Sequence, residues 1–171
     1  MKYKFRNELL EKDEEFKTIF TNLINTGEIN EFDDKIKSII LRDRTAIVIG
    51  KEPLAFKDLF HQGITGGKCK LCAFELVLLL DKLGIYSEAV YTNNKYFINT
   101  EGSYDGGHWY VEAYFDKEPL LIDTSLMITG NADAFKKLGH KIIRKCDIDT
   151  LFKENSELID YYENMIIHKW Y

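Results

Sequence analysis

Proline and cysteine are both scarce in this chain of 171 residues. The two prolines, Pro53 and Pro119, lie far apart, and no Ser/Pro-rich linker, repeat or low-complexity tract divides the sequence. Residues 1–171 are therefore expected to form a single domain, which is long enough to bury most of its apolar surface in one core. Three cysteines are an odd number, so we expect reduced thiols rather than a disulfide framework.

Long apolar runs and clustered basic charge are missing as well. The charged start MKYKFRNELLEKDEE lacks the apolar segment of a secretory signal, and the longest apolar run, 76–80, is far too short to cross a bilayer. A net charge of −5 with both signs interspersed argues against a nucleic-acid surface. We expect a cytoplasmic protein with no membrane or nucleic-acid partner, and signal-independent export as an effector or toxin stays open.

Helical spacing of apolar residues predicts helices near both ends of the chain and one apolar helix at its centre. The expected ranges are 7–26, 30–41, 69–83, a short helix near 132–138 and a C-terminal helix from about 148. The helix over 69–83 has almost no polar face, so it should be buried nearly all round, and Gly84 is expected to end it.

Alternating apolar and polar residues predict strands in the second half of the chain. The expected ranges are 87–92, 95–99, 108–115, 120–123 and 141–145, and the segment 45–50 fits either a short strand or a helix end. Helices outside a meander of antiparallel strands give an α+β fold. Within it, residues 1–60 are expected to form a helical N-terminal extension, 61–125 to carry the catalytic motifs and 126–171 to form a C-terminal part.

Cys69 is the strongest candidate for a nucleophile. It follows the glycine-rich loop HQGITGGK and begins the apolar helix. A thiol at a helix N-terminus lies near the positive end of the helix dipole, which favours the thiolate. The glycines let the backbone approach a reacting centre, and free amides at the helix start can bind an oxyanion. Gln62, in the same loop, is a candidate for a further oxyanion donor through its side-chain amide.

Cys72 competes with Cys69 because it lies one turn further along the same helix. A buried cysteine is usually a small apolar core residue, and we expect this role for Cys72. The Cys-x-x-Cys pair is also compatible with a redox centre or with zinc, for which only His140 and Cys146 offer a second pair of ligands. We expect neither a metal nor another cofactor.

His108 and Asp123 are the expected partners of the nucleophile. His108 follows two glycines at the start of a strand, and Asp123 ends the apolar run of the next strand. If the two strands pair through the short connection at 116–119, Asp123 returns beside His108. An imidazole that takes the thiol proton and a carboxylate that orients the imidazole make a thiol nucleophilic. The plain alternative for Asp123 is to cap the turn into Thr124 and Ser125.

These three blocks resemble the transglutaminase-like branch of the papain-like cysteine proteases. Family members have Gly-x-Cys-x-x-x-Ala at the start of the nucleophile helix and Leu-Gly-Ile at its end, and GKCKLCA and LGI stand here in the same register. HWYVE resembles the second block, although the Trp directly follows the His, and DTS resembles the third block without its proline. The resemblance covers about residues 66–125, and the pattern of papain itself fits less well.

The resemblance implies a papain-like core in which a buried nucleophile helix packs on an antiparallel sheet. It implies Cys69 as nucleophile, His108 as base and acid, and Asp123 as orienting carboxylate, but it does not supply a substrate. We expect a protein or peptide substrate and no cofactor. The leading function is an amide or peptide hydrolase that works through a thioacyl intermediate.

Two other functions stay open. One is a transamidase or deamidase that uses a glutamine side chain and an amine acceptor, and the other is an inactive binding module of the same fold. An acceptor channel would need aromatic walls, for which five tyrosines are candidates, although sheet-surface positions suit them better: Tyr86, Tyr91, Tyr96, Tyr104 and Tyr110.

Overall fold

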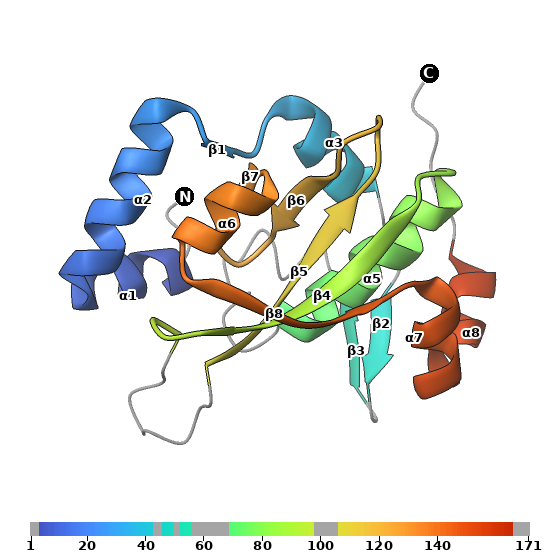
Figure 1. Ribbon diagram of the computed structural model, residues 1–171. Helices are drawn as coiled ribbons and strands as arrows, with labels where there is room; N and C mark the ends of the chain where they lie inside the picture. Colours follow the sequence, from blue (N-terminus) through green and yellow to red (C-terminus); the bar gives the residue numbers. More distant parts are fainter. Residues whose placement is uncertain (1–3, 43–45, 50–51, 56–68, 98–105, 166–171) are drawn as a thin grey trace.

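The computed structural model describes residues 4–42, 46–49, 52–55, 69–97 and 106–165, and Figure 1 shows their arrangement. A six-stranded sheet has the order β1-β7-β6-β5-β4-β8, and every neighbouring pair is antiparallel. Its strands are β1 (Ile29–Glu31), β4 (Ser87–Asn94), β5 (Gly107–Ala113), β6 (Leu120–Asp123), β7 (Ile128–Gly130) and β8 (His140–Cys146). A separate antiparallel pair consists of β2 (Ala46–Ile49) and β3 (Glu52–Ala55).

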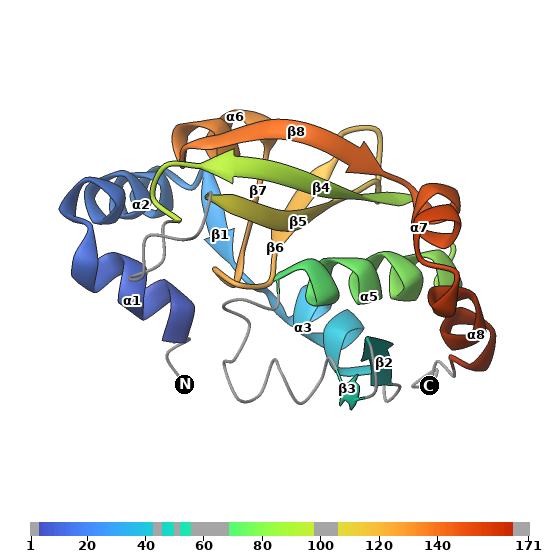
Figure 2. The same ribbon diagram turned by 90° about the horizontal axis from the view of Figure 1, so that it is seen from below.

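Helices lie on both faces of the six-stranded sheet (Figure 2). α5 (Cys69–Lys82) runs along one face and contacts β4 and β5, and α6 (Ala132–Lys137) lies over the other. Two further pairs, α1 (Lys4–Lys12) with α2 (Glu14–Thr26) and α7 (Ile148–Glu154) with α8 (Glu157–Asn164), stand at opposite ends of the sheet. α3 (Asp34–Arg42) lies on the α5 side. No helix of the described residues is long and apolar enough to span a bilayer.

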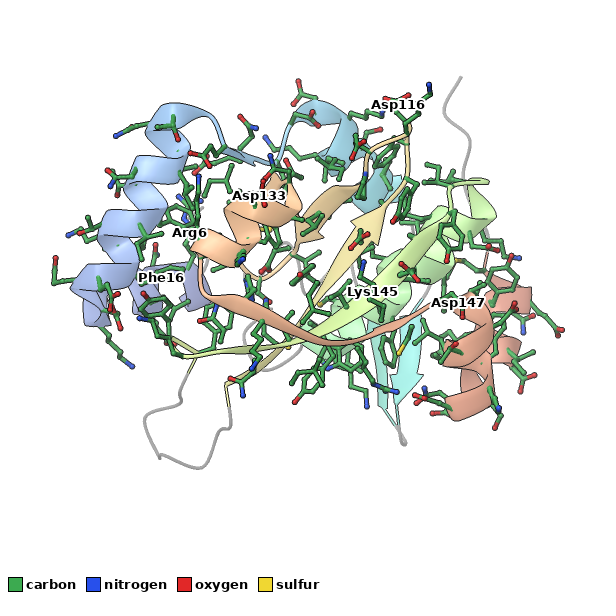
Figure 3. All side chains as sticks on the ribbon, viewed as in Figure 1. Arg6, Phe16, Asp116, Asp133, Lys145 and Asp147 are labelled. Atoms are coloured by element: carbon green, nitrogen blue, oxygen red, sulfur yellow. The ribbon has the colours of Figure 1, made fainter. Side chains whose placement is uncertain are left out.

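Each face of the sheet has its own apolar core because side chains alternate along a strand. On β5, Trp109, Val111 and Ala113 pack with the buried side chains of α5. Tyr110, which points to the other face, packs in a second core with apolar residues of α1, α2 and α6, among them Phe16 (Figure 3). The start of β5 and the start of α5 therefore meet between the two cores.

The α+β class expected from the sequence is confirmed, and so is the apolar central helix. Every residue of α5 from 72 to 80 is buried. The helix ends at Lys82, and Gly84 then takes a left-handed conformation with φ 76°. This end leaves Ile85 free to donate its N–H to the carbonyl of Leu80 at 2.8 Å, as in a glycine C-cap.

Two expected helices have different bounds, and side-chain caps explain both. The helix expected at 7–26 is divided into α1 and α2 because the Asp13 carboxylate accepts the N–H of Phe16 at 2.9 Å and starts a new helix. The helix expected at 30–41 begins only at Asp34, because the Asp33 carboxylate accepts the N–H of Ile36 at 2.9 Å and starts the helix there. Residues 29–31 instead pair with β7 as the edge strand β1.

Other differences lie at turns. Residues 95–97, expected as part of a strand, form a turn in which the Asn94 side chain accepts the N–H of Tyr96 at 2.9 Å. The C-terminal helix from 148 is two helices, α7 and α8, and β7 was not predicted. The segment 45–50, for which the sequence allowed either a short strand or a helix end, contains the strand β2. The described part of the first 60 residues, which were expected to be a helical extension, thus contains three strands as well as three helices.

Candidate active site

Three element ends bring Cys69, His108 and Asp123 together. Cys69 is the first residue of α5, His108 the second of β5, and Asp123 the last of β6. β5 and β6 pair in a register that sets Val111 opposite Ile122. One step further, Asp123 lies on the same face as His108 and within diagonal reach of it. The pairing expected from the short connection therefore places the carboxylate beside the imidazole.

The imidazole of His108 joins the other two groups. Its Nε2 lies 2.8 Å from Oδ2 of Asp123, and the ring also hydrogen-bonds the Cys69 thiol. Because Asp123 engages Nε2, Nδ1 is the nitrogen available to the sulfur. Cys69 is 7% exposed, His108 1% and Asp123 0%, so all three residues are shielded from bulk water and only Cys69 keeps a small exposed area. Phe97 packs edge-on against the His108 ring, with centroids 4.5 Å apart.

Asp123 has both of the roles considered from the sequence. Its Oδ2 faces His108, and its Oδ1 accepts the backbone N–H groups of Ser125 at 2.8 Å and Leu126 at 3.0 Å. The carboxylate therefore caps the turn after β6 while it contacts the imidazole. These three hydrogen bonds satisfy a charge that would otherwise be costly to bury.

Electrostatics favours the ionised form of all three groups. Burial alone raises the pKa of the Cys69 thiol, but the hydrogen bond and positive charge of His108, with the backbone N–H of Trp109, outweigh it and hold that pKa below its ordinary value. Burial likewise opposes the imidazolium, yet the Asp123 charge raises the pKa of His108 to about 10. The pKa of Asp123 is lowered, since the His108 charge overcomes the effect of burial. The three shifts together favour a thiolate, an imidazolium and a carboxylate over the neutral forms of these groups.

The pKa of the Cys72 thiol is shifted in the opposite direction to that of Cys69. Cys72 is fully buried, and its pKa is raised, first by burial and then by the charge of nearby Glu75. Such a thiol is a core residue, as expected. The second ligand pair of a zinc site, His140 and Cys146, occupies the two ends of β8, roughly 20 Å apart for a seven-residue strand. The described residues hold no group of three or more potential metal ligands.

The other residues named from the sequence are Gln62 and five tyrosines. Gln62, the candidate oxyanion donor, lies outside the described residues, and so does Tyr104. Tyr86 and Tyr96 lie beyond opposite ends of β4, and Tyr110 is buried in the second core. Tyr91 packs against the Trp109 ring in the core on the α5 side, so the candidate tyrosines of the described part do not line one common channel.

Sequence reasoning missed a group that supports His108 from the side of β4 and β8. The ring of His140 stacks on His108, with centroids 5.5 Å apart and planes at 19°. Thr92 on β4 links the two histidines, because its Oγ1 lies 3.3 Å from the His108 carbonyl and 3.1 Å from Nδ1 of His140. A shared signal was present: each histidine follows a glycine at the start of a strand.

Comparison of the chain with protein-family models, with curated proteins and with solved structures gave no match.

Proposed function

We propose that this protein is a cysteine-dependent hydrolase of amide or peptide bonds, of the transglutaminase-like kind. The observation that carries the proposal is the buried imidazole of His108, which contacts the Cys69 thiol and lies 2.8 Å from Asp123. The same three residues carry the sequence resemblance, in the same roles. A thiolate, an imidazolium and a carboxylate in one line are what a cysteine nucleophile needs near pH 7.

The reaction begins with attack of the Cys69 sulfur on the carbonyl carbon of the substrate, which forms a C–S bond and a tetrahedral oxyanion. His108 then donates its proton to the leaving nitrogen. The C–N bond breaks, the amine departs, and a thioester remains on Cys69. Asp123 keeps the ring oriented and stabilises its charged form throughout.

Water completes the cycle. His108, now neutral, takes a proton from a water molecule, whose oxygen attacks the thioester carbon. The second tetrahedral species breaks its C–S bond and releases the carboxylic acid, and the thiolate–imidazolium pair is restored. The backbone N–H groups of the first turn of α5 have no partners within the helix, so they are suited to bind the oxyanion in both halves of the reaction.

The test is a search for the thioacyl intermediate on Cys69. The protein is mixed at pH 7 with a library of short N-acylated peptide amides, quenched in acid, and analysed by intact-protein and peptide mass spectrometry. We expect acyl adducts on Cys69 in the wild type, and none in Cys69→Ala. Cys72→Ala, a substitution one turn further along the same helix, serves as the matched control and should still form them.

The acceptor is identified from the decay of the adduct in a single turnover. Decay in buffer alone supports the hydrolase, whereas decay that requires an added primary amine would replace it by the transamidase. A wild-type chain that forms no adduct, and whose alkylation by iodoacetamide is slow and unchanged by His108→Ala, would be a binding module instead.

A further inference from the structure

His140 begins β8 and lies against the catalytic candidate His108 on the side away from α5. It is 6% exposed. Besides the stacked His108, three aromatic rings surround it: those of Phe97, Tyr110 and Phe135, with centroid distances of 5.4, 5.1 and 5.6 Å. An imidazole is thus held in an aromatic cage directly beside the imidazole that contacts the thiol.

Asn94 and Thr92 on β4 both contact Nδ1 of His140. The amide of Asn94 is oriented at both ends, because its Oδ1 accepts the N–H of Tyr96 at 2.9 Å and its Nδ2 donates to the carbonyl of Leu138 at 2.9 Å. The same Nδ2 lies 3.3 Å from Nδ1 of His140. The hydroxyl of Thr92 lies 3.1 Å from the same Nδ1, so the imidazole of His140 is held by two polar side chains of β4.

The surroundings keep His140 uncharged. The titratable groups that face it are His108 and Tyr110 on β5 and Asp123 on β6. Burial and the positive charge of His108 lower the pKa of His140 to about 3, although the Asp123 charge opposes them. The two stacked histidines therefore differ in charge: His108 is an imidazolium and His140 a neutral ring.

We propose that His140 is a positioning residue, whose stacked neutral ring holds the His108 imidazole in the plane that joins Cys69 to Asp123. The inference rests on the proposed function, since it concerns the same triad of Cys69, His108 and Asp123. The His108 ring meets Phe97 edge-on at 4.5 Å and His140 face-on at 5.5 Å. Rotation of His108 about its side-chain bonds would require one of these rings to move. The stack also excludes water from the His108–Asp123 pair, which strengthens their attraction.

The positioning role of His140 depends on two features, the stacked surface of its ring and the hydrogen bonding of its Nδ1. A phenyl ring at position 140 keeps the stacked surface but loses the hydrogen bonds of Nδ1 with Asn94 and Thr92. It also removes Nε2 of His140, a buried atom that meets no hydrogen-bond partner among the described residues. Glutamine keeps an acceptor of similar reach but loses the ring. Alanine loses both, so the three substitutions separate stacking from hydrogen bonding.

The experiment measures how fast iodoacetamide alkylates Cys69 between pH 4 and 9, with peptide mapping to identify the cysteine. We expect His140→Phe to keep the wild-type acid midpoint and a rate at pH 6 within about threefold. His140→Gln and His140→Ala should move the midpoint up by about one pH unit, which makes alkylation about tenfold slower on the acid side. Leu23→Ala, a cavity in the same core on α2, is the control: it should lower stability but leave the midpoint unchanged.

An unchanged midpoint in folded His140→Ala would overturn the positioning role, and so would a glutamine variant that behaves like wild type while the phenylalanine variant fails. If these variants do not fold, imidazole ¹⁵N resonances of the wild type decide: His140 must be neutral at pH 6, with one protonated ring nitrogen, and a doubly protonated His140 would end the proposal. A wild-type Cys69 that reacts no faster at pH 6 than a free thiol refutes the proposed function itself, and the imidazole resonances still report on His140 separately.

Discussion

Cys69 and Cys72 lie one turn apart on α5, yet the pKa values of their thiols are shifted in opposite directions. The pKa of Cys69 is lowered because the charge and hydrogen bond of His108 outweigh burial, and the pKa of Cys72 is raised because burial and the Glu75 charge act together. Both sulfurs belong to largely buried residues. Contact with the imidazole, and not exposure, therefore distinguishes the nucleophile candidate from a core thiol.

We expect iodoacetamide to modify Cys69 at pH 6 about tenfold or more faster than a free cysteine, and to leave Cys72 unmodified in the folded protein. His108→Ala should remove this advantage, since it takes away the positive partner of the thiolate. Peptide mapping of the alkylated chain at short times provides the measurement. Preferential modification of Cys72 would identify Cys72, and not Cys69, as the nucleophile.

Substitutions of Asp123 should separate its charge from its role in the turn. Asp123→Ala removes the acceptor of the Ser125 and Leu126 amides as well as the partner of His108, so it should cost about 1–3 kcal/mol of stability and reduce amide hydrolysis by roughly a thousandfold. Asp123→Asn retains an acceptor for the turn, and it should keep most of the stability while activity stays low.

These two effects are measured by chemical denaturation and by turnover of a substrate found with the peptide library. Asp116→Asn is the matched control because Asp116 is an exposed residue in the turn between β5 and β6 (Figure 3). It should change neither quantity by more than about 0.5 kcal/mol or threefold. Full turnover in a folded Asp123→Ala chain would remove the carboxylate from the mechanism.

The meeting of Cys69, His108 and Asp123 could be anticipated because each lies at a local boundary that the sequence marks. A Gly-Gly pair precedes the helix, another directly precedes His108, and an apolar run ends at the aspartate. The short connection between β5 and β6 then leaves little freedom in how the strands pair, so the distance between imidazole and carboxylate follows from local rules.

The stack of His140 on His108 could not be anticipated in the same way. It depends on β8 pairing beside β4, in a register that sets Asn94 opposite His140. The pairing of Ile29 on β1 with Gly130 on β7 is equally remote along the chain. No pattern within a window of the sequence distinguishes such a pairing from its alternatives, because it is decided by which edge of the completed sheet remains available.

The pH dependence of stability should show that His140 is neutral in the folded protein. Its folded pKa of about 3 is below its ordinary value of 6.5, so as the pH falls from 6.5 toward 3 only the unfolded chain takes up this proton, and stability is lost. His108, with a folded pKa of about 10, contributes stability that is fully present below pH 6.5 and disappears as the pH rises through 10. His108 therefore adds no slope below pH 6.5.

The comparison is made in a Cys69→Ala background, which removes the titration of the Cys69 thiol from the pH dependence of stability. Between pH 6.5 and pH 5, the free energy of unfolding should fall by about 1–2 kcal/mol more in the chain with His140 than in the chain with His140→Gln. Urea denaturation at several pH values gives both curves. Parallel curves would mean that His140 gains its proton in the folded state as readily as in the unfolded state.

Gly106 connects the triad to the end of β4, and alanine at this position should be damaging. Its φ is 76°, and an added Cβ would lie 2.6 Å from the backbone oxygen of Asn94. Gly84 has the same φ with nothing within 4 Å of an added Cβ, so Gly84→Ala should cost only about 1–2 kcal/mol of left-handed strain. Gly106→Ala should cost more, because backbone must also move.

Gly106→Ala should also slow the alkylation of the Cys69 thiol. The carbonyl of Gly106 accepts the N–H of Asn94 at 2.8 Å, two residues before His108, so a displaced backbone here moves the start of β5 and with it the imidazole. Gly106→Ala should therefore reduce the rate of Cys69 alkylation at pH 6, while Gly84→Ala at the far end of α5 leaves it unchanged. Equal unfolding free energies and equal alkylation rates in the two variants would show that the close approach of Gly106 to Asn94 does not hold His108 in place.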